Sequence, residues 1–100
     1  MTRTVRVLKR AERDLGEIHR YVARDKPSAA DDLLERLLGA IESLSEHAER
    51  GARPRDERLL RLGYQYLVRE PYLVFYKVLP RQVRSYRILH GRRLLGVLLG

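Results

Sequence analysis

The spacing of apolar residues changes abruptly near Leu62, and this change constrains the fold of the chain more than any other feature. Before it, apolar residues recur every three or four positions, the period of an amphipathic helix. After it, aromatic and β-branched residues fill the segments 63–69, 72–79 and 83–90, separated by turns of two or three residues. Strands joined so closely can only be antiparallel neighbours. The second half therefore predicts a three-stranded meander, and the nearly continuous apolar run 72–79 suits a central strand covered on both faces.

The first half predicts a short strand over Thr4–Leu8 and then two helices. The first helix ends before Pro27, because a proline disfavours helix in the residue that precedes it and fits the first turn of a new helix. The second helix carries a broad apolar stripe from position 30 to 48, and Gly51 is its predicted end. Residues 51–58 are polar and predict a loop. The stripe of the first helix consists of Ala11, Leu15, Ile18 and Val22, with Glu12, Arg13, Asp14, Glu17 and Arg20 on its polar side.

These elements predict how the chain is layered. Two helices joined by so short a turn form a hairpin, whose apolar stripes need a surface, while the meander needs a cover for one face. The expected fold is a two-layer α+β domain of order βααβββ, a helical hairpin packed on a small antiparallel sheet. Leu37 and Ile41 should lie buried between the layers. The length of 100 residues suits a single domain over 1–100.

The residue composition and the distribution of charge exclude several classes of function. The chain has no cysteine, which excludes disulfides, a thiol nucleophile and thiolate zinc sites. It shows neither a membrane-spanning apolar run nor a signal peptide, so we expect a cytoplasmic protein with no membrane contact. The formal net charge of +8 lies entirely in residues 51–100, because acidic and basic residues balance in residues 1–50. Such asymmetry indicates an anionic partner: nucleic acid, an acidic protein segment or a lipid surface.

Four segments carry a resemblance to a known family. They are the run Ala11–Ile18 followed by Tyr21, the helix start Pro27–Ala30, the pair Gly63-Tyr64 leading into Tyr72–Tyr76, and the run Arg87–Arg93. In this order and spacing they resemble the RelE/ParE superfamily of bacterial toxins, and the ParE branch more closely. The resemblance implies the toxin of a type II toxin–antitoxin module, neutralised by a cognate ParD-like antitoxin. It implies that operator DNA is contacted only through the antitoxin. The chain departs from the pattern at Gln65 and Leu94.

Members of the superfamily differ in their molecular target, and the resemblance is compatible with either of two targets. ParE-like members resemble one another in poisoning DNA gyrase by binding it, whereas RelE-like members cleave messenger RNA on the ribosome without a metal. Such cleavage needs an acid, a base and cations around the phosphate. A nuclease would draw these from His90, Arg87 and Arg93, but the C-terminal tyrosine of RelE-like sites is missing. We therefore expect a non-enzymatic gyrase inhibitor, with a ribosome-dependent endoribonuclease or a plain nucleic-acid-binding domain as alternatives.

The candidate contacts with target or antitoxin lie near the C-terminal end of the last strand. His90 is a candidate acid or base, because histidine can exchange a proton under physiological conditions, but a structural role in holding the turn at Gly91 is favoured. The tyrosines of the second half could stack bases, but core packing is the favoured interpretation. The three histidines lie on different elements, so no metal or other cofactor is expected. The candidate binding residues are Arg69, Arg87, His90, Arg92, Arg93, Leu94 and Leu95.

Overall fold

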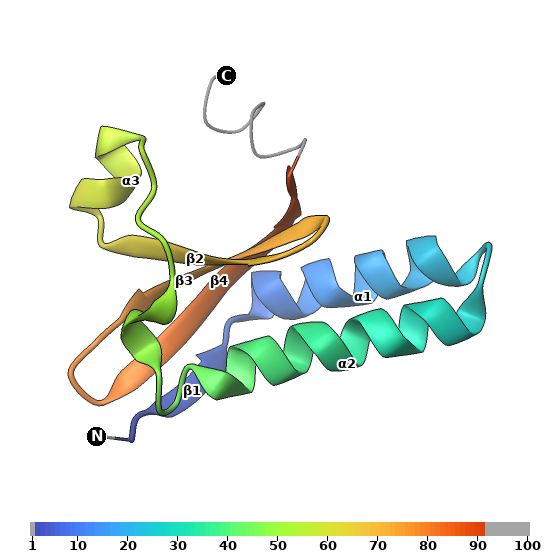
Figure 1. The fold of residues 1–100 in the computed structure, drawn as a ribbon, viewed down its shortest axis with the longest axis horizontal. Helices are drawn as coiled ribbons and strands as arrows, with labels where there is room; N and C mark the ends of the chain where they lie inside the picture. The colour runs from blue at the N-terminus through green and yellow to red at the C-terminus, as the bar shows by residue number, and fades with distance from the viewer. Residues whose placement is uncertain (1, 92–100) are drawn as a thin grey trace.

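The computed structural model, which describes residues 2–91, places a helical hairpin against one face of a four-stranded sheet (Figure 1). Within these residues no helix is long and apolar enough to cross a membrane. The spatial order of the strands is β1-β4-β3-β2. The elements are β1 (Thr4–Val7), α1 (Lys9–Ala23), α2 (Pro27–Ser43), the 3₁₀ turn η1 (Ala48–Arg50), α3 (Glu57–Arg61), β2 (Tyr64–Arg69), β3 (Tyr72–Val78) and β4 (Gln82–His90).

The predicted meander of β2, β3 and β4 is confirmed, with β3 at its centre. The sheet as a whole is mixed rather than antiparallel, because β1 pairs in parallel with β4. The reason is topological. The chain leaves β1 through the whole hairpin and meander before β4 returns beside it, and such a long connection permits parallel pairing. The two-layer α+β architecture is otherwise as expected.

The second helix ends earlier than the sequence predicts. Helix α2 ends at Ser43, and Ala48 belongs to η1. Gly51 is therefore not a helix stop. It is needed for close packing, because a Cβ there would collide with the Tyr76 hydroxyl and lie 2.9 Å from the Tyr66 carbonyl oxygen.

The loop predicted at 51–58 runs into a short helix, α3, that sequence reasoning missed. Asp56 caps it: its Oδ1 accepts hydrogen bonds from the Arg58 and Leu59 backbone N–H groups at 2.9 and 3.1 Å. The Leu59 N–H, followed by the Arg58 side chain, holds the pKa of the Asp56 carboxyl below its ordinary value. At the end of α3, Gly63 adopts a φ of 86°, the left-handed conformation that glycine tolerates and that turns the chain into β2.

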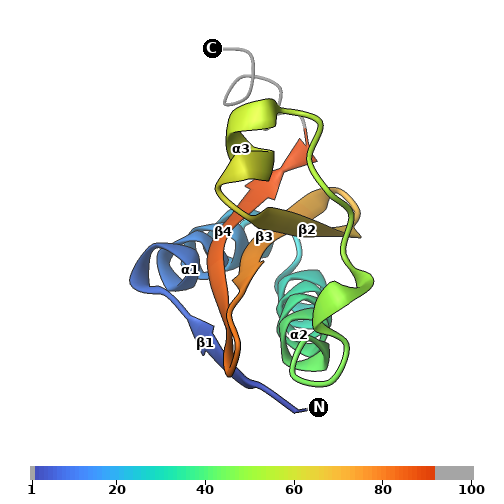
Figure 2. The same ribbon diagram turned by 90° about the vertical axis from the view of Figure 1, so that its left-hand side faces the viewer.

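Apolar side chains cover both faces of β3, as expected for a central strand. The hairpin-facing core joins Leu15, Leu37 and Ile41 to the sheet residues Val74 and Ile88. The opposite face holds a smaller cluster, and α3 lies over that side (Figure 2). Its members are Leu73, Phe75 and Leu89, with Leu59, Tyr64 and Tyr66 packed against them.

Replacing Leu37 with alanine should lower the free energy of unfolding by about 2–5 kcal/mol. Leu37 is fully buried between the layers, as the sequence predicts, so truncation removes transfer energy and leaves a cavity. The neighbouring Leu38 is 38% exposed and gives a matched control, Leu38→Ala, with an expected change of about 0.5 kcal/mol or less. Urea unfolding of both variants measures the difference. Equal losses would mean that the stripe of α2 does not face the sheet.

The buried Tyr76 phenol should make the stability of the fold depend on pH. Its buried hydroxyl accepts the Gly51 N–H at 2.9 Å and donates to the Ala48 carbonyl at 2.8 Å. Burial, the largest cause, raises the pKa of the Tyr76 phenol, and burial likewise raises those of Tyr64 and Tyr72. Because the native state holds these protons more tightly than the unfolded chain, their contribution is complete below the ordinary tyrosine pKa of about 10 and declines as pH rises through the folded values.

We therefore expect the melting temperature to fall as the pH rises above about 10. In Tyr76→Phe the fall should be smaller, although the variant is less stable at neutral pH because the Gly51 N–H and the Ala48 carbonyl lose their partner. Thermal melts monitored by circular dichroism across this range test both expectations. An identical alkaline fall in the variant would remove Tyr76 from the titration.

Candidate functional site

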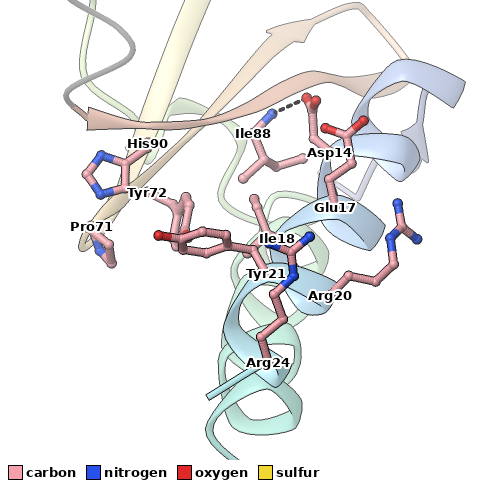
Figure 3. Close-up of a pocket in the computed structure, with 10 residues that line it drawn as sticks. All are labelled: Asp14, Glu17, Ile18, Arg20, Tyr21, Arg24, Pro71, Tyr72, Ile88 and His90. Carbon is pink, nitrogen blue, oxygen red and sulfur yellow. Dashed lines mark hydrogen bonds between the residues drawn. The ribbon is translucent and has the colours of Figure 1, made fainter. Parts of the chain in front are cut away.

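A cleft of about 630 Å³ lies between the second half of α1 and the end of the sheet where β4 finishes and β2 turns into β3 (Figure 3). Helix α1 and its capping residue Arg24 supply one wall, because the side chains at 17, 18, 21 and 24 recur at helical spacing. The sheet supplies the other wall. The lining residues are Asp14, Glu17, Ile18, Arg20, Tyr21, Arg24, Pro71, Tyr72, Ile88 and His90.

Aromatic rings form the middle of the cleft. Tyr21 is 68% exposed, the largest exposed fraction among the large apolar side chains of residues 2–91, and it lies across the cleft toward Tyr72 (Figure 3). His90 meets the Tyr72 ring edge to face, with centroids 5.5 Å apart and planes at 82°. Burial, and secondarily the Tyr21 phenol, raises the pKa of Tyr72. The Tyr72 hydroxyl therefore stays protonated at neutral pH.

Charges surround the rings without forming a catalytic cluster. Arg20 projects from the last turn of α1 and Arg24 directly follows the helix, and Figure 3 shows Arg24 reaching up beside Tyr21. Glu17 and the buried Asp14 also line the cleft, and Figure 3 shows them on the same side as Arg20. An apolar or aromatic side chain that is followed by a carboxylate fits this arrangement, because the ring faces take the apolar part and the arginines take the charge.

Asp14 is the residue that sequence reasoning placed wrongly. Its side chain is 3% exposed rather than solvated. Oδ2 accepts from the Ile88 backbone N–H at 3.0 Å and from Arg87 Nε at 2.8 Å, and Arg10 Nη1 lies 2.8 Å from Oδ1. β1 pairs with β4 only up to Ser85. Beyond that point the Asp14 carboxylate, rather than a strand, accepts the hydrogen bond from the β4 backbone at Ile88. The signal was available: Asp14 follows Ala11 by three positions and precedes Ile18 by four, which puts it beside the apolar stripe.

The predicted site residues are only partly brought together. Arg69, Tyr72 and His90 form a row across β2, β3 and β4 at one end of the sheet. The Arg69 guanidinium donates to the Val68 carbonyl at 2.8 Å. Arg87 is bound to Asp14 and does not line the cleft. Arg92, Arg93, Leu94 and Leu95 lie outside the described residues, so their role stays a prediction. Within residues 2–91, no group of three or more possible metal ligands occurs.

The helical hairpin over a mixed sheet of order β1-β4-β3-β2 is the fold of two solved toxin–antitoxin structures. A solved structure, the chromosomal ParDE toxin–antitoxin system from P. aeruginosa, matches with a TM-score of 0.72 at 22% identity, covering 89% of this chain and 96% of that one. The toxin–antitoxin complex RelBE2 from Mycobacterium tuberculosis matches with a TM-score of 0.62 at 24% identity, covering 90% and 99%.

Sequence comparison gives the family. The model of the ParE toxin of the type II toxin–antitoxin system parDE matches residues 5–95. Toxin RelE3 of Caulobacter vibrioides is 33% identical over 82 residues, which are 82% of this chain and 87% of that protein. The chain therefore belongs to the ParE toxin family of type II toxin–antitoxin systems, and the family resemblance of the sequence is confirmed.

Proposed function

We propose that this toxin acts in the cytoplasm by binding and inhibiting DNA gyrase, without hydrolytic chemistry of its own. The observation that carries the proposal is the placement of the two described nuclease candidates. The Arg87 guanidinium is held by the buried Asp14 carboxylate, and the His90 ring packs against Tyr72 in the cleft. Phosphate cleavage needs an acid or base and cations converging on one phosphate. An arginine engaged in a buried ion pair is better suited to holding the fold.

We further propose that the cleft receives the cognate ParD-like antitoxin. An acidic, amphipathic segment that folds on binding would place an apolar side chain against Tyr21 and Tyr72 and carboxylates near Arg20 and Arg24. The solved structures that share the fold are toxin–antitoxin systems, which supports such a partner. The gene beside this one should encode a small protein with a DNA-binding part and an acidic, apolar part, and contact with operator DNA would be made through it.

One observation favours a second function. The curated relative at 33% identity carries the name Toxin RelE3, and RelE-like members cleave messenger RNA on the ribosome. Under this alternative His90 would transfer a proton. The Arg87 guanidinium would have to leave the Asp14 carboxylate and bind the phosphate of the RNA instead.

A parallel assay separates the two functions. Purified toxin is added to gyrase with relaxed plasmid and ATP, and separately to a translating extract in which messenger RNA is followed by primer extension. We expect loss of supercoiling, intact messenger RNA, and restored supercoiling when antitoxin is added first. Codon-specific cleavage with normal supercoiling would replace the proposal by the ribonuclease.

Replacing His90 with alanine should leave toxicity largely intact. His90 packs on one edge of Tyr72, and its loss changes a cleft wall rather than a reaction. In a nuclease, removal of a general acid or base costs roughly 100- to 10,000-fold in rate. Growth after induction, compared with the exposed control His47→Ala, measures the effect, and circular dichroism confirms that both variants fold. A folded His90→Ala protein without toxicity would favour the ribonuclease.

A further inference from the structure

Three cations stand side by side on the sheet face opposite the hairpin. Arg6 on β1 is the register partner of Arg84 on β4, and Arg84 is that of Lys77 on β3. Lys77 pairs in turn with Tyr64 on β2, so the three cations and this tyrosine form a line across all four strands. Neighbouring strands lie about 4.8 Å apart, so Arg6 and Lys77 stand roughly 10 Å apart at the backbone. We call Arg6, Arg84 and Lys77 the cationic row.

Strand alternation fixes the face. Val5, Val7, Val83 and Val78 pack in the hairpin-facing core, so their neighbours Arg6, Arg84 and Lys77 point to the other side. Helix α3 covers a different part of this face, over Leu73, Phe75 and Leu89 (Figure 2). Arg6 is exposed, and Arg84 and Lys77 are partly exposed.

The row lacks charge compensation within the described part of the chain. None of its members forms an ion pair with a carboxylate of residues 2–91. Arg84 Nε donates only to Gln82 Oε1, at 2.7 Å. Lys77 Nζ lies over the rings of Tyr64 and Tyr86, 4.5 and 5.0 Å from their centroids. Like charges opposite one another on neighbouring strands oppose pairing, so this arrangement works against the sheet unless an anion binds it.

We propose that the cationic row binds the phosphodiester backbone of a nucleic acid directly. A row of cations beside polar aromatic rings suits a regular polyanion, and release of counterions drives such binding. An amphipathic protein segment would also require apolar surface. The exposed large apolar side chains of residues 2–91 lie elsewhere: Tyr21, Leu38, Leu60, Leu62 and Val68. The proposal goes beyond the gyrase assignment and does not depend on it, because the row lies outside the cleft and holds no candidate catalytic residue.

The test compares two doubly substituted toxins with equal charge. Arg6→Gln plus Arg84→Gln removes two members of the row, whereas Arg13→Gln plus Lys26→Gln removes two exposed cations from the hairpin. Fluorescence anisotropy is measured with labelled duplex DNA, single-stranded DNA and single-stranded RNA over a range of salt concentrations. The three probes distinguish which nucleic acid supplies the phosphates.

We expect the row variant to bind on the order of tenfold more weakly at low salt, and its slope of log affinity against log salt to fall by about 2. The hairpin control should stay close to the parent. Because like-charge repulsion is relieved, the melting temperature of the row variant should equal or exceed that of the parent. Should the row variant fail to fold, Lys77→Gln replaces it, with an expected slope change of about 1.

Three results would overturn the proposal. One is the absence of binding to all three probes at low salt. Another is an equal loss in the row variant and the hairpin control, which would reflect net charge alone. The third is unchanged nucleic-acid binding with weakened antitoxin binding, which would make the row a protein contact. A toxin that fails to inhibit gyrase but shows the expected salt slopes leaves this inference standing.

Discussion

Replacing Asp14 with alanine should lower the free energy of unfolding by about 3–5 kcal/mol, enough to unfold much of a domain this small. The substitution removes the acceptor of the Ile88 N–H and of Arg87 Nε in one step. An unpaired buried N–H and a half-buried guanidinium are then left without a partner. Arg10, 2.8 Å from the same carboxylate, loses its contact as well.

Two further variants separate the charge from the hydrogen bond. Asp14→Asn keeps an oxygen for the Ile88 N–H but removes the charge, so we expect an intermediate loss. Arg87→Ala in the Asp14→Ala background should add little, because the pair is already broken and the two changes are coupled. Urea unfolding of the parent, Asp14→Ala, Arg87→Ala and the double alanine variant measures the coupling. Strictly additive losses would show that Asp14 and Arg87 act independently, and Arg87 would return to the candidate target contacts.

Asp14 also shows how far sequence reasoning reaches into this fold. Hydrophobic periodicity predicts both helices, the meander and the buried positions of Leu37 and Ile41, because these depend on local spacing. Asp14 is assigned to the polar side of α1 because it is charged. Helical spacing does place it beside the apolar stripe, but spacing has no information about the β4 edge beyond Ser85 that needs an acceptor. The parallel pairing of β1 depends on which strand ends up beside it, which is a tertiary property. Helix α3 depends on one capping carboxylate, Asp56, within a polar segment.

The residues of the candidate site are likewise only partly predictable from the sequence. The sequence places Arg69 and His90 near strand ends, and the structure aligns them on either side of Tyr72. Tyr21 appears in the sequence only as part of the family resemblance, since an aromatic residue on α1 could equally belong to the core. Its exposure and its position opposite Tyr72 follow from how α1 packs on β4. The cationic row requires the register of two strand pairs, β1 with β4 and β4 with β3, which spacing alone does not supply.

Replacing Tyr21 with glutamate should abolish neutralisation by the antitoxin while the toxin stays folded and active. Tyr21 is 68% exposed, so its removal takes little from the core. In the cleft it is the aromatic anchor that the proposed antitoxin segment would cover, and truncation of such anchors costs 2 kcal/mol or more, at least about thirtyfold in affinity. Glutamate adds repulsion against an acidic segment, whereas Tyr21→Ala removes the contact alone.

The difference between the two Tyr21 variants is the informative quantity. If Arg20 and Arg24 attract carboxylates of the antitoxin, Tyr21→Glu should bind more weakly than Tyr21→Ala, and the gap should shrink as salt screens the repulsion. Leu62→Ala, which removes an exposed apolar side chain beside α3, is the control and should bind like the parent. Calorimetric titration gives the affinities, and co-expression should restore growth arrest only for the Tyr21 variants. A folded Tyr21→Glu toxin that is neutralised as well as the parent would place the antitoxin outside this cleft.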